Sequence, residues 1–323
     1  MSTRTALSRP RLAQGTLLLA SMLTIMAGAT IAPALVVIEQ RFSTAPNAEI
    51  LVGLVLTMHG LFITICSPIM GVLADRYGRR WVLLGSTVVY AIAGGSGLVV
   101  DSLIGILAGR AVLGVAVAGV MVTVTALISD YYDERKRETV LGRQGAFMSL
   151  GGVVLLPLAG VLADIGWRVP FLVYTLALVL LPAMAIALPE PKTHESTPEA
   201  VDSNHKRTGA FPLGTLGVIV ALGLVGQIFF YMIPVQLPFY LETQAGANGS
   251  LIGTVLAVSA GAGGIASLLY GRLRRTLRVL DIVVLTFGLM GVGYAVIGTN
   301  DPPRYRHGRR NRRLWQWVSH HES

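Results

Sequence analysis

The sequence predicts an all-α membrane protein, and three properties of the chain support this fold class. Only 13% of its 323 residues are charged and 53% are hydrophobic, whereas a soluble domain carries about 25% charged residues. The mean hydropathy is +0.64. Nine long stretches contain almost no charged side chains, and a helix of roughly 20 apolar residues crosses a bilayer. Lipid is therefore the expected solvent for much of the surface.

Each of the nine stretches is expected to be a helix, because a helix satisfies its own backbone hydrogen bonds in lipid. The alternating strands of a membrane barrel are absent from the sequence. The first stretch follows several arginines, as a signal peptide does, but its length and the later spans favour a retained helix. The expected spans are Leu12–Ile38, Ile50–Ala74, Trp81–Val100, Ser102–Ser129, Gln144–Ala163, Val169–Pro189, Phe211–Tyr240, Thr243–Gly271 and Ile282–Asn300.

Lysine and arginine are distributed unequally between the loops. If the N-terminus is cytoplasmic, the segments on that side hold 17 of them, and the other side, up to residue 300, holds only Arg41 and Arg168. This positive-inside bias predicts a multi-pass protein of a plasma membrane, such as a bacterial inner membrane, with a cytoplasmic N-terminus. Because the basic residues lie between apolar runs, the net charge of +9 is not interpreted as a nucleic-acid surface. The single cysteine, Cys66, excludes a disulfide within the chain.

A polar segment rich in Pro, Ser, Thr and charge divides the spans into groups of six and three. This composition is typical of a flexible linker. The second span of each group ends in a similar way, in Gly71-Val-Leu and in Gly271-Arg-Leu, and a basic turn follows each. The match suggests two related halves. The predicted organisation is a six-helix bundle over residues 1–189, a cytoplasmic linker over 190–210 and a partial bundle of three helices over 211–300.

Residues 301–323 do not fit this pattern. They hold six arginines, three of the six histidines and two of the four tryptophans. An odd number of spans places them outside the cytoplasm, against the positive-inside bias. We expect this basic tail to be a non-native continuation, of the kind that a reading-frame change or a truncation produces. The alternative is a native tail that Trp315 and Trp317 hold at a lipid surface.

The most specific motif lies between the second and third spans. It reads GVLADRYGRR over residues 71–80 and resembles the signature loop of the major facilitator superfamily. Gly71 is expected to let a neighbouring helix approach closely, Gly78 to allow a tight turn, and Asp75 to pair with a basic residue or a helix N-terminus. The paired arginines are expected to anchor the cytoplasmic edge. The signature-loop residues are Gly71, Asp75, Arg76, Gly78, Arg79 and Arg80.

The resemblance extends over roughly residues 12–298 and has implications for the fold. The superfamily has twelve helices in two six-helix bundles, a substrate site between them and a transport cycle in which the halves rock. Its signature loop also packs near the eleventh helix. In this chain the second bundle would lack its last three helices.

Two ionisable residues lie deep in the first six spans. Arg110 begins the segment Arg110-Ala-Val-Leu-Gly114 of the fourth span, which is similar to a motif of the superfamily's proton-coupled members. His59 of the second span lies at a similar depth, and a histidine titrates near neutral pH. Both are therefore candidates for proton coupling. The alternatives are an arginine that bonds backbone carbonyls and a histidine that bonds a neighbouring helix.

The fifth span carries Gly152, Pro157 and Gly160, which resemble the helix-bending motif of the superfamily's exporting antiporters. Leu156 and Val161 stand where that motif has glycine. A proline among small residues gives a helix that bends and packs closely. Ordinary glycine-rich packing is the alternative.

The seventh span supplies candidates for a substrate cavity. Gln227, Phe230 and Tyr231 are suited to an amphipathic or aromatic solute, and aromatic core packing is the alternative. The sequence contains no phosphate-binding Gly-rich loop, no His-Glu-x-x-His, no G-x-S-x-G and no paired carboxylates within a span. We therefore expect no use of ATP, no cofactor, no metal site and no enzymatic activity.

Together these features predict a secondary active transporter whose partners are a small-molecule substrate, protons and the lipid bilayer. The first hypothesis is proton-coupled export of drug-like or amphipathic compounds, as in multidrug efflux. A sugar or metabolite transporter of the same superfamily is the alternative within transport. An inactive, truncated membrane protein is the alternative outside it. The sequence does not determine the oligomeric state.

Overall fold

The computed structural model describes residues 10–191 and 213–299, with only the backbone described at some positions inside these ranges. Every regular element in this part of the chain is a helix. Nine of the described helical segments are long and apolar enough to cross a membrane, as the sequence predicts. The basic tail and nearly all of the predicted linker lie outside the described residues. The chain divides into two compact units, and the boundary between them in the sequence lies between Leu269 and Tyr270.

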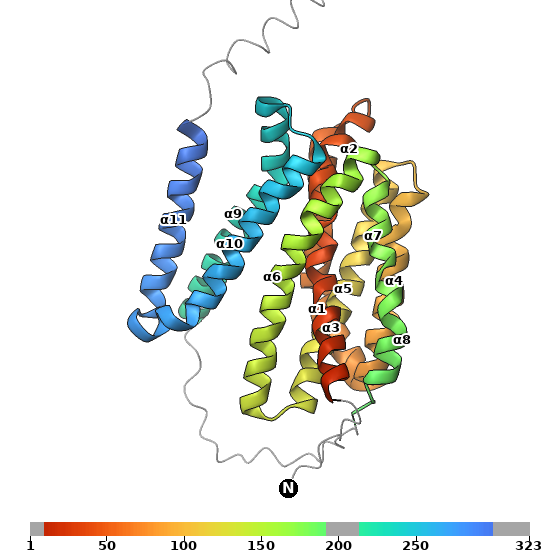
Figure 1. Ribbon diagram of the computed structural model, residues 1–323, viewed down its shortest axis with the longest axis vertical. Helices are drawn as coiled ribbons and strands as arrows, with labels where there is room; N and C mark the ends of the chain where they lie inside the picture. Colours follow the sequence, from red (N-terminus) through yellow and green to blue (C-terminus); the bar gives the residue numbers. More distant parts are fainter. Residues whose placement is uncertain (1–9, 192–212, 300–323) are drawn as a thin grey trace, which may run out of the picture. The chain divides into compact units, whose positions relative to one another are not determined.

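The first six spans lie before the linker (Figure 1). The first and sixth are broken into shorter helices, whereas the sequence predicts each as one continuous helix. They are α1 (Pro10–Ala29), η1 (Ala32–Ala34) and α2 (Leu35–Arg41); α3 (Ala48–Tyr77); α4 (Arg79–Gly95) with η2 (Ser96–Leu98); α5 (Leu103–Tyr131); α6 (Glu134–Ile165); and η3 (Val169–Phe171), α7 (Leu172–Thr175) and α8 (Ala177–Ala187).

The break in the first span has a local cause. Pro33 lies at the start of η1 and has no backbone N–H to continue an α-helical ladder. The chain tightens before it, so that the Ile31 N–H bonds the carbonyl of Gly28, three residues back, at 3.3 Å. The carbonyl of Ala27 is therefore left without its usual helical partner.

The most buried of these spans are the first and the fourth. In their apolar windows 67% and 61% of residues are buried, against 22% in α3 and 33% in α6. Helix α5 packs against α1, α3, α4 and α6, and α1 also contacts α8. Alanine and glycine on α1 and α5 allow this close packing, which gives the six spans a common core.

The outer faces of the helices expose large apolar side chains. On α3, Ile50, Leu61 and Ile69 are more than half exposed, and Ile104 of α5 is 75% exposed. A soluble protein does not leave apolar surface of this extent in water. These faces are suited to lipid.

Several turns between the helices are closed by side-chain caps and by one unusual glycine. The side chain of Ser102 accepts from the Gly105 N–H at the start of α5, and Asp133 accepts from the Lys136 N–H at the start of α6. Both are residue types that favour helix N-termini. Gly78 alone separates α3 from α4 and has φ of +96°, a backbone conformation that strongly favours glycine.

Three spans follow the linker: α9 (Leu213–Ala245), α10 (Gly249–Thr276) and α11 (Val279–Thr299). Helix α9 contacts α2 and α3. Helix α10 begins six residues later than the sequence predicts, because α9 continues past Tyr240 to Ala245. The apolar helix α11 belongs to the second compact unit.

Substitution of Gly94 by alanine should destabilise the six-span core. An added Cβ would lie 2.5 Å from the ring of Tyr174, which is fully buried. Overpacking of this kind costs about 1–3 kcal/mol, so the thermal midpoint of the detergent-solubilised protein should fall. Gly85 of the same helix is the matched control, because an added Cβ there meets nothing within 4 Å. An equal midpoint for Gly94→Ala and Gly85→Ala would contradict the packing described.

Candidate functional site

Arg110 lies in the middle of the core and is 1% exposed. Its Nε donates to the Val55 carbonyl of α3 at 2.9 Å, and its Nη2 donates to the Ala27 carbonyl of α1 at 2.6 Å. Its Nη1 donates to the hydroxyl of Tyr174 at 2.7 Å. A buried charge requires such partners. The guanidinium of α5 therefore joins three other spans.

The carbonyl of Ala27 is able to accept these bonds because of the break between α1 and η1. It receives the Tyr174 hydroxyl at 2.9 Å as well as the guanidinium of Arg110. The Ile31 N–H, its usual partner in a helix, bonds Gly28 instead. The break in the first span thus leaves an acceptor in the core.

Gly114 brings α5 against the backbone of α3. A Cβ at Gly114 would lie 2.4 Å from the carbonyl oxygen of His59, so only glycine permits this approach. Gly114 follows Arg110 by four residues, and His59 follows Val55 by four residues. The two helices therefore meet along one face of each. Gly114 packs against the backbone of His59, and Arg110 bonds the carbonyl of Val55.

His59 is 2% exposed and lies at the same junction. A Cβ at Gly28 of α1 would come within 3.4 Å of its Nε2. Its Nδ1 is buried and has no hydrogen-bond partner among the described residues. The structure therefore brings both predicted proton-coupling candidates to the contact of α1, α3 and α5. Each nitrogen of the Arg110 guanidinium has a hydrogen-bond partner, whereas the buried Nδ1 of His59 has none among the described residues.

One of the three substrate-cavity candidates reaches this region. The hydroxyl of Tyr231, on α9, would lie 3.4 Å from a Cβ at Gly60, the residue after His59. Tyr231 also makes an edge contact with the ring of Phe230 at a centroid distance of 5.8 Å. Phe230 and Gln227 are exposed. Only Tyr231 therefore lies against the α3 backbone beside the buried histidine.

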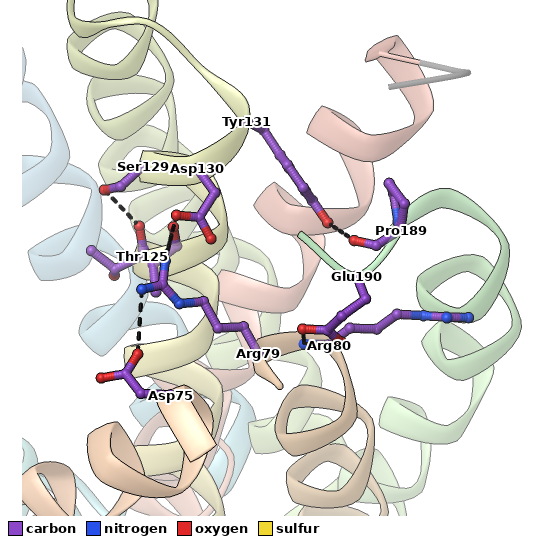
Figure 2. Close-up of polar contacts among 10 residues, drawn as sticks. Asp75, Arg79, Arg80, Thr125, Ser129, Asp130, Tyr131, Pro189 and Glu190 are labelled. Atoms are coloured by element: carbon purple, nitrogen blue, oxygen red, sulfur yellow. Dashed lines mark hydrogen bonds and ion pairs between the residues drawn. The ribbon is translucent and has the colours of Figure 1, made fainter. Parts of the chain in front are cut away.

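The signature loop forms a polar cluster at one end of the helices (Figure 2). Arg79 donates through Nη1 to Asp130 at the end of α5, at 2.5 Å, and to the Ala126 carbonyl at 3.3 Å. Its Nη2 donates to Asp75 at 3.3 Å. Arg79 thus holds the α3–α4 turn against α5. The predicted pairing of Asp75 with a basic residue is present, although its side chain is 71% exposed.

Arg80 and Glu190 connect α4 to the end of the sixth span. The Arg80 backbone N–H donates to the Glu190 carboxylate at 3.2 Å, and the Arg80 Nη2 donates to the Ala185 carbonyl at 2.7 Å. The carboxylate therefore caps the positive N-terminal end of α4. A Cβ at Gly78 would lie 2.9 Å from this carboxyl group. Beside it, the Tyr131 hydroxyl donates to the Pro189 carbonyl at 2.5 Å.

Two other residues of the signature loop make only loose contacts. A Cβ at Gly71 would meet Val122 at 3.9 Å, an ordinary contact, whereas one at Gly114 would lie 2.4 Å from the His59 carbonyl oxygen. A close helix approach at Gly71 is not seen among the described residues and stays a prediction. Arg76 lies over the ring of its neighbour Tyr77 at 5.6 Å.

The motif of the fifth span lies along a seam between α6 and α10, which we call the α6–α10 seam. A Cβ at Gly160 would lie 2.2 Å from the carbonyl oxygen of Gly249, and one at Gly249 would lie 2.6 Å from that of Gly160. A Cβ at Gly253 would lie 2.4 Å from the carbonyl oxygen of Leu156. The two backbones are thus in contact. A leucine at position 156 is compatible with the seam because the glycine of this contact is Gly253, which lies on α10.

Further along the seam the contact is made by small side chains. A Cβ at Gly152 would lie 3.2 Å from the Cβ of Ala260 on α10. Helix α6 continues through Pro157 as one element. Val161 is half exposed. The three predicted residues therefore share the helix that forms the seam, and two of them, Gly152 and Gly160, lie directly in it.

Three residues that sequence reasoning did not single out make essential contacts. Tyr174 bonds Arg110, Glu190 caps α4, and Asp164 accepts from the Gly249 N–H of α10 at 2.6 Å. A carboxylate at the end of an apolar span is a signal for helix capping, but the sequence does not indicate which helix is capped. Within the described ranges, no group of three or more His, Cys, Asp or Glu side chains is placed to hold a metal ion.

Known proteins are similar to this chain in sequence and in fold. The family model described as Major Facilitator Superfamily matches residues 17–304. The MFS-type efflux transporter pyiT of Pyricularia grisea is 37% identical over 107 residues, which make up 31% of this chain and 17% of that protein. The tetracycline resistance protein, class C, of Escherichia coli is 35% identical over 130 residues, 37% of this chain and 30% of that protein. The match thus spans less than a third of either relative.

A solved structure has the same arrangement of helices. The crystal structure of a D-xylose-proton symporter superposes with a TM-score of 0.73 and covers 91% of this chain and 76% of that one. The sequence identity is 16%, so this likeness concerns the fold alone.

Substitution of Arg110 by lysine should destabilise the protein although the positive charge is kept. A lysine ammonium on one flexible stem cannot reach acceptors on three spans in the geometry of a guanidinium. A hydrogen bond to a charged group contributes about 1.5–3 kcal/mol, so a loss of about that size is expected in thermal unfolding. Tyr174→Phe removes a single donor and should cost less. If Arg110→Lys unfolds at the parent temperature, the guanidinium bonds do not stabilise the core.

Substitution of Glu190 by alanine should lower the thermal midpoint because the N-terminus of α4 loses its cap. Loss of such a cap costs about 1 kcal/mol. Glu138→Ala is the control, since it removes the same charge from an exposed position on α6. A midpoint for Glu190→Ala that equals that of the control would show that the capping bond contributes nothing.

Proposed function

Because the chain belongs to the Major Facilitator Superfamily, we propose that it is a secondary active transporter that exports small drug-like or amphipathic compounds in exchange for protons. The observation that carries the proposal is the α6–α10 seam, where Gly160 and Gly249 bring two backbones into contact. The resemblance of Gly152, Pro157 and Gly160 to the motif of exporting antiporters supports export. The efflux and tetracycline resistance proteins among the relatives support it as well.

His59 is the residue that we assign to proton coupling. It is buried, its Nδ1 has no partner among the described residues, and an imidazole in water titrates near neutral pH. Arg110 has a different role in this proposal. All three of its nitrogens are bonded to Val55, Ala27 and Tyr174, so it positions α1 and α3 around the histidine.

Tyr231 is the substrate contact with the best support. Its hydroxyl lies against Gly60, one residue from His59, and its ring is paired with Phe230. An aromatic ring with a polar end binds solutes that are themselves partly apolar and partly polar. Gln227 adds a neutral amide to the same helix. This chemistry fits an amphipathic or aromatic compound better than a polyhydroxylated sugar.

The proposed location is a plasma membrane, such as a bacterial inner membrane, with the N-terminus in the cytoplasm. The positive-inside bias supports this orientation. In it, the polar cluster around Arg79 lies on the cytoplasmic side, and the α6–α10 seam ends on the outer side.

Transport in proteoliposomes with an imposed pH gradient tests the proposal. Ethidium and tetracycline are the probes, and radiolabelled D-xylose represents the sugar alternative. An antiporter should accumulate a probe in the acidic compartment, because protons leave that compartment as the probe enters. Accumulation on the alkaline side would indicate symport, and the absence of any gradient-driven flux would contradict the proposed function.

His59→Gln should abolish the acceleration of flux by the gradient. A fall of roughly tenfold or more is expected, since a factor of ten corresponds to about 1.4 kcal/mol in a rate barrier. Leu61→Ala is the control, because Leu61 lies two residues further along α3 and its side chain is 56% exposed. If the His59→Gln protein responds to the gradient as the Leu61→Ala protein does, the assignment of the coupling residue is wrong.

A further inference from the structure

The outer end of the α6–α10 seam carries a carboxylate that belongs neither to the signature loop nor to the motif of the fifth span. Asp164 lies at the end of α6, four residues beyond Gly160. Its Oδ1 accepts from the Gly249 N–H at 2.6 Å, and its Oδ2 accepts from the Ser250 N–H at 3.0 Å. The Ser250 hydroxyl also donates to Oδ2. One side chain therefore makes three hydrogen bonds to the first two residues of α10.

These bonds complete the N-terminus of α10. The first N–H groups of a helix have no partner within it. Asn248 satisfies only one of them, the Leu251 N–H, at 3.0 Å. Asp164 satisfies the two before it, and its negative charge also interacts favourably with the positive end of the helix dipole. Two residues thus cap α10: Asn248, which directly precedes it, and Asp164, which lies on another span.

The two partners belong to different predicted halves. Asp164 lies in the six-span bundle and α10 in the segment after the linker. Just below the carboxylate, a Cβ at Gly160 would lie 2.2 Å from the Gly249 carbonyl oxygen. Because the backbones already touch there, α10 cannot separate from α6 at this end without breaking the bonds to Asp164.

Other outer-side polar contacts are weaker or lie within one half. Gln40 donates to Glu242 at 3.3 Å, a single bond between exposed side chains of α2 and α9. Asp101 pairs with Arg168, but both residues belong to the six-span bundle. Among the described residues, Asp164 therefore makes three hydrogen bonds between the two predicted halves at this surface, against the single bond of Glu242.

We propose that Asp164 is a gating residue, which holds the outer ends of α6 and α10 together and releases α10 when the pathway opens to the outer side. Its part in transport rests on the proposed function. The contact itself does not, since it can be measured without any substrate. The carboxylate is a positioning group in this scheme and does not touch the transported compound.

The experiment measures outer accessibility of a single cysteine in the full-length chain. Cys66 is first replaced by alanine, and Ile252, which is 1% exposed on α10 one turn beyond Gly249, is replaced by cysteine. A membrane-impermeant maleimide is added to the outer side of sealed vesicles. The labelling rate is compared for the parent, for Asp164→Ala and for the milder Asp164→Asn. Thermal unfolding of each variant verifies that it is folded.

Asp164→Ala should accelerate labelling about fivefold, which corresponds to the loss of about 1 kcal/mol that is typical of a removed helix N-cap. Asp164→Asn retains one acceptor oxygen and should give a smaller increase. Asp101→Asn is the matched control, because it removes a carboxylate at the same surface whose partner lies in its own half. It should change the rate by less than about twofold, as expected of an exposed ion pair.

Two results would overturn the inference. One is a labelling rate for Asp164→Ala that is no faster than that of the parent. The other is equal acceleration by Asp101→Asn, which would mean that the outer surface loosens in general. Faster labelling confined to the Asp164 variants supports the gate even if no probe is transported in the flux assay, so that failure of the proposed function remains distinguishable from failure of the gate.

Discussion

The burial of one positive charge is the constraint on which the first six spans depend. Arg110 is 1% exposed in a part of the chain where lipid and apolar side chains surround the helices, and an unsatisfied charge there is very costly. Its partners are two backbone carbonyls and the Tyr174 hydroxyl. The break in the first span and the glycine at position 114 are both consistent with this requirement, because one frees an acceptor and the other brings α3 within reach.

The remaining polar contacts lie mainly at the ends of the helices. At one end Arg79 and Glu190 join α4 to α5 and to the sixth span. At the other end Asp164 joins α6 to α10. Between these levels the close contacts include glycine against backbone, as at Gly114, and the buried bond from the Tyr90 hydroxyl to the Leu23 carbonyl. This division is physical, since charged groups retain water near the membrane surfaces while the interior relies on close packing.

The two ends also differ in what they connect. The bonds of Arg79 and Arg80 run between helices of the predicted six-span bundle, so they can persist while a second half moves. The bonds of Asp164 cross to α10. A transporter of the proposed kind requires both, a bundle that stays intact and a contact that opens. His59 lies at the tight contact of α3 and α5 and, through Gly60, beside Tyr231 of α9.

The sequence by itself determined the nine spans that the described residues contain, because span length and charge are local properties that lipid selects directly. The motif at residues 71–80 indicated the family. The sequence also identified Arg110, His59 and the glycines of the fifth span as unusual. Only the tertiary structure decided their partners. The acceptors of Arg110 and the helices capped by Glu190 and Asp164 lie far away in the chain. Gly71 and Gly114 differ in what lies opposite, since Gly71 meets a side chain of α5 and Gly114 meets the backbone of α3. Such contacts arise from packing, which no local pattern of residues specifies.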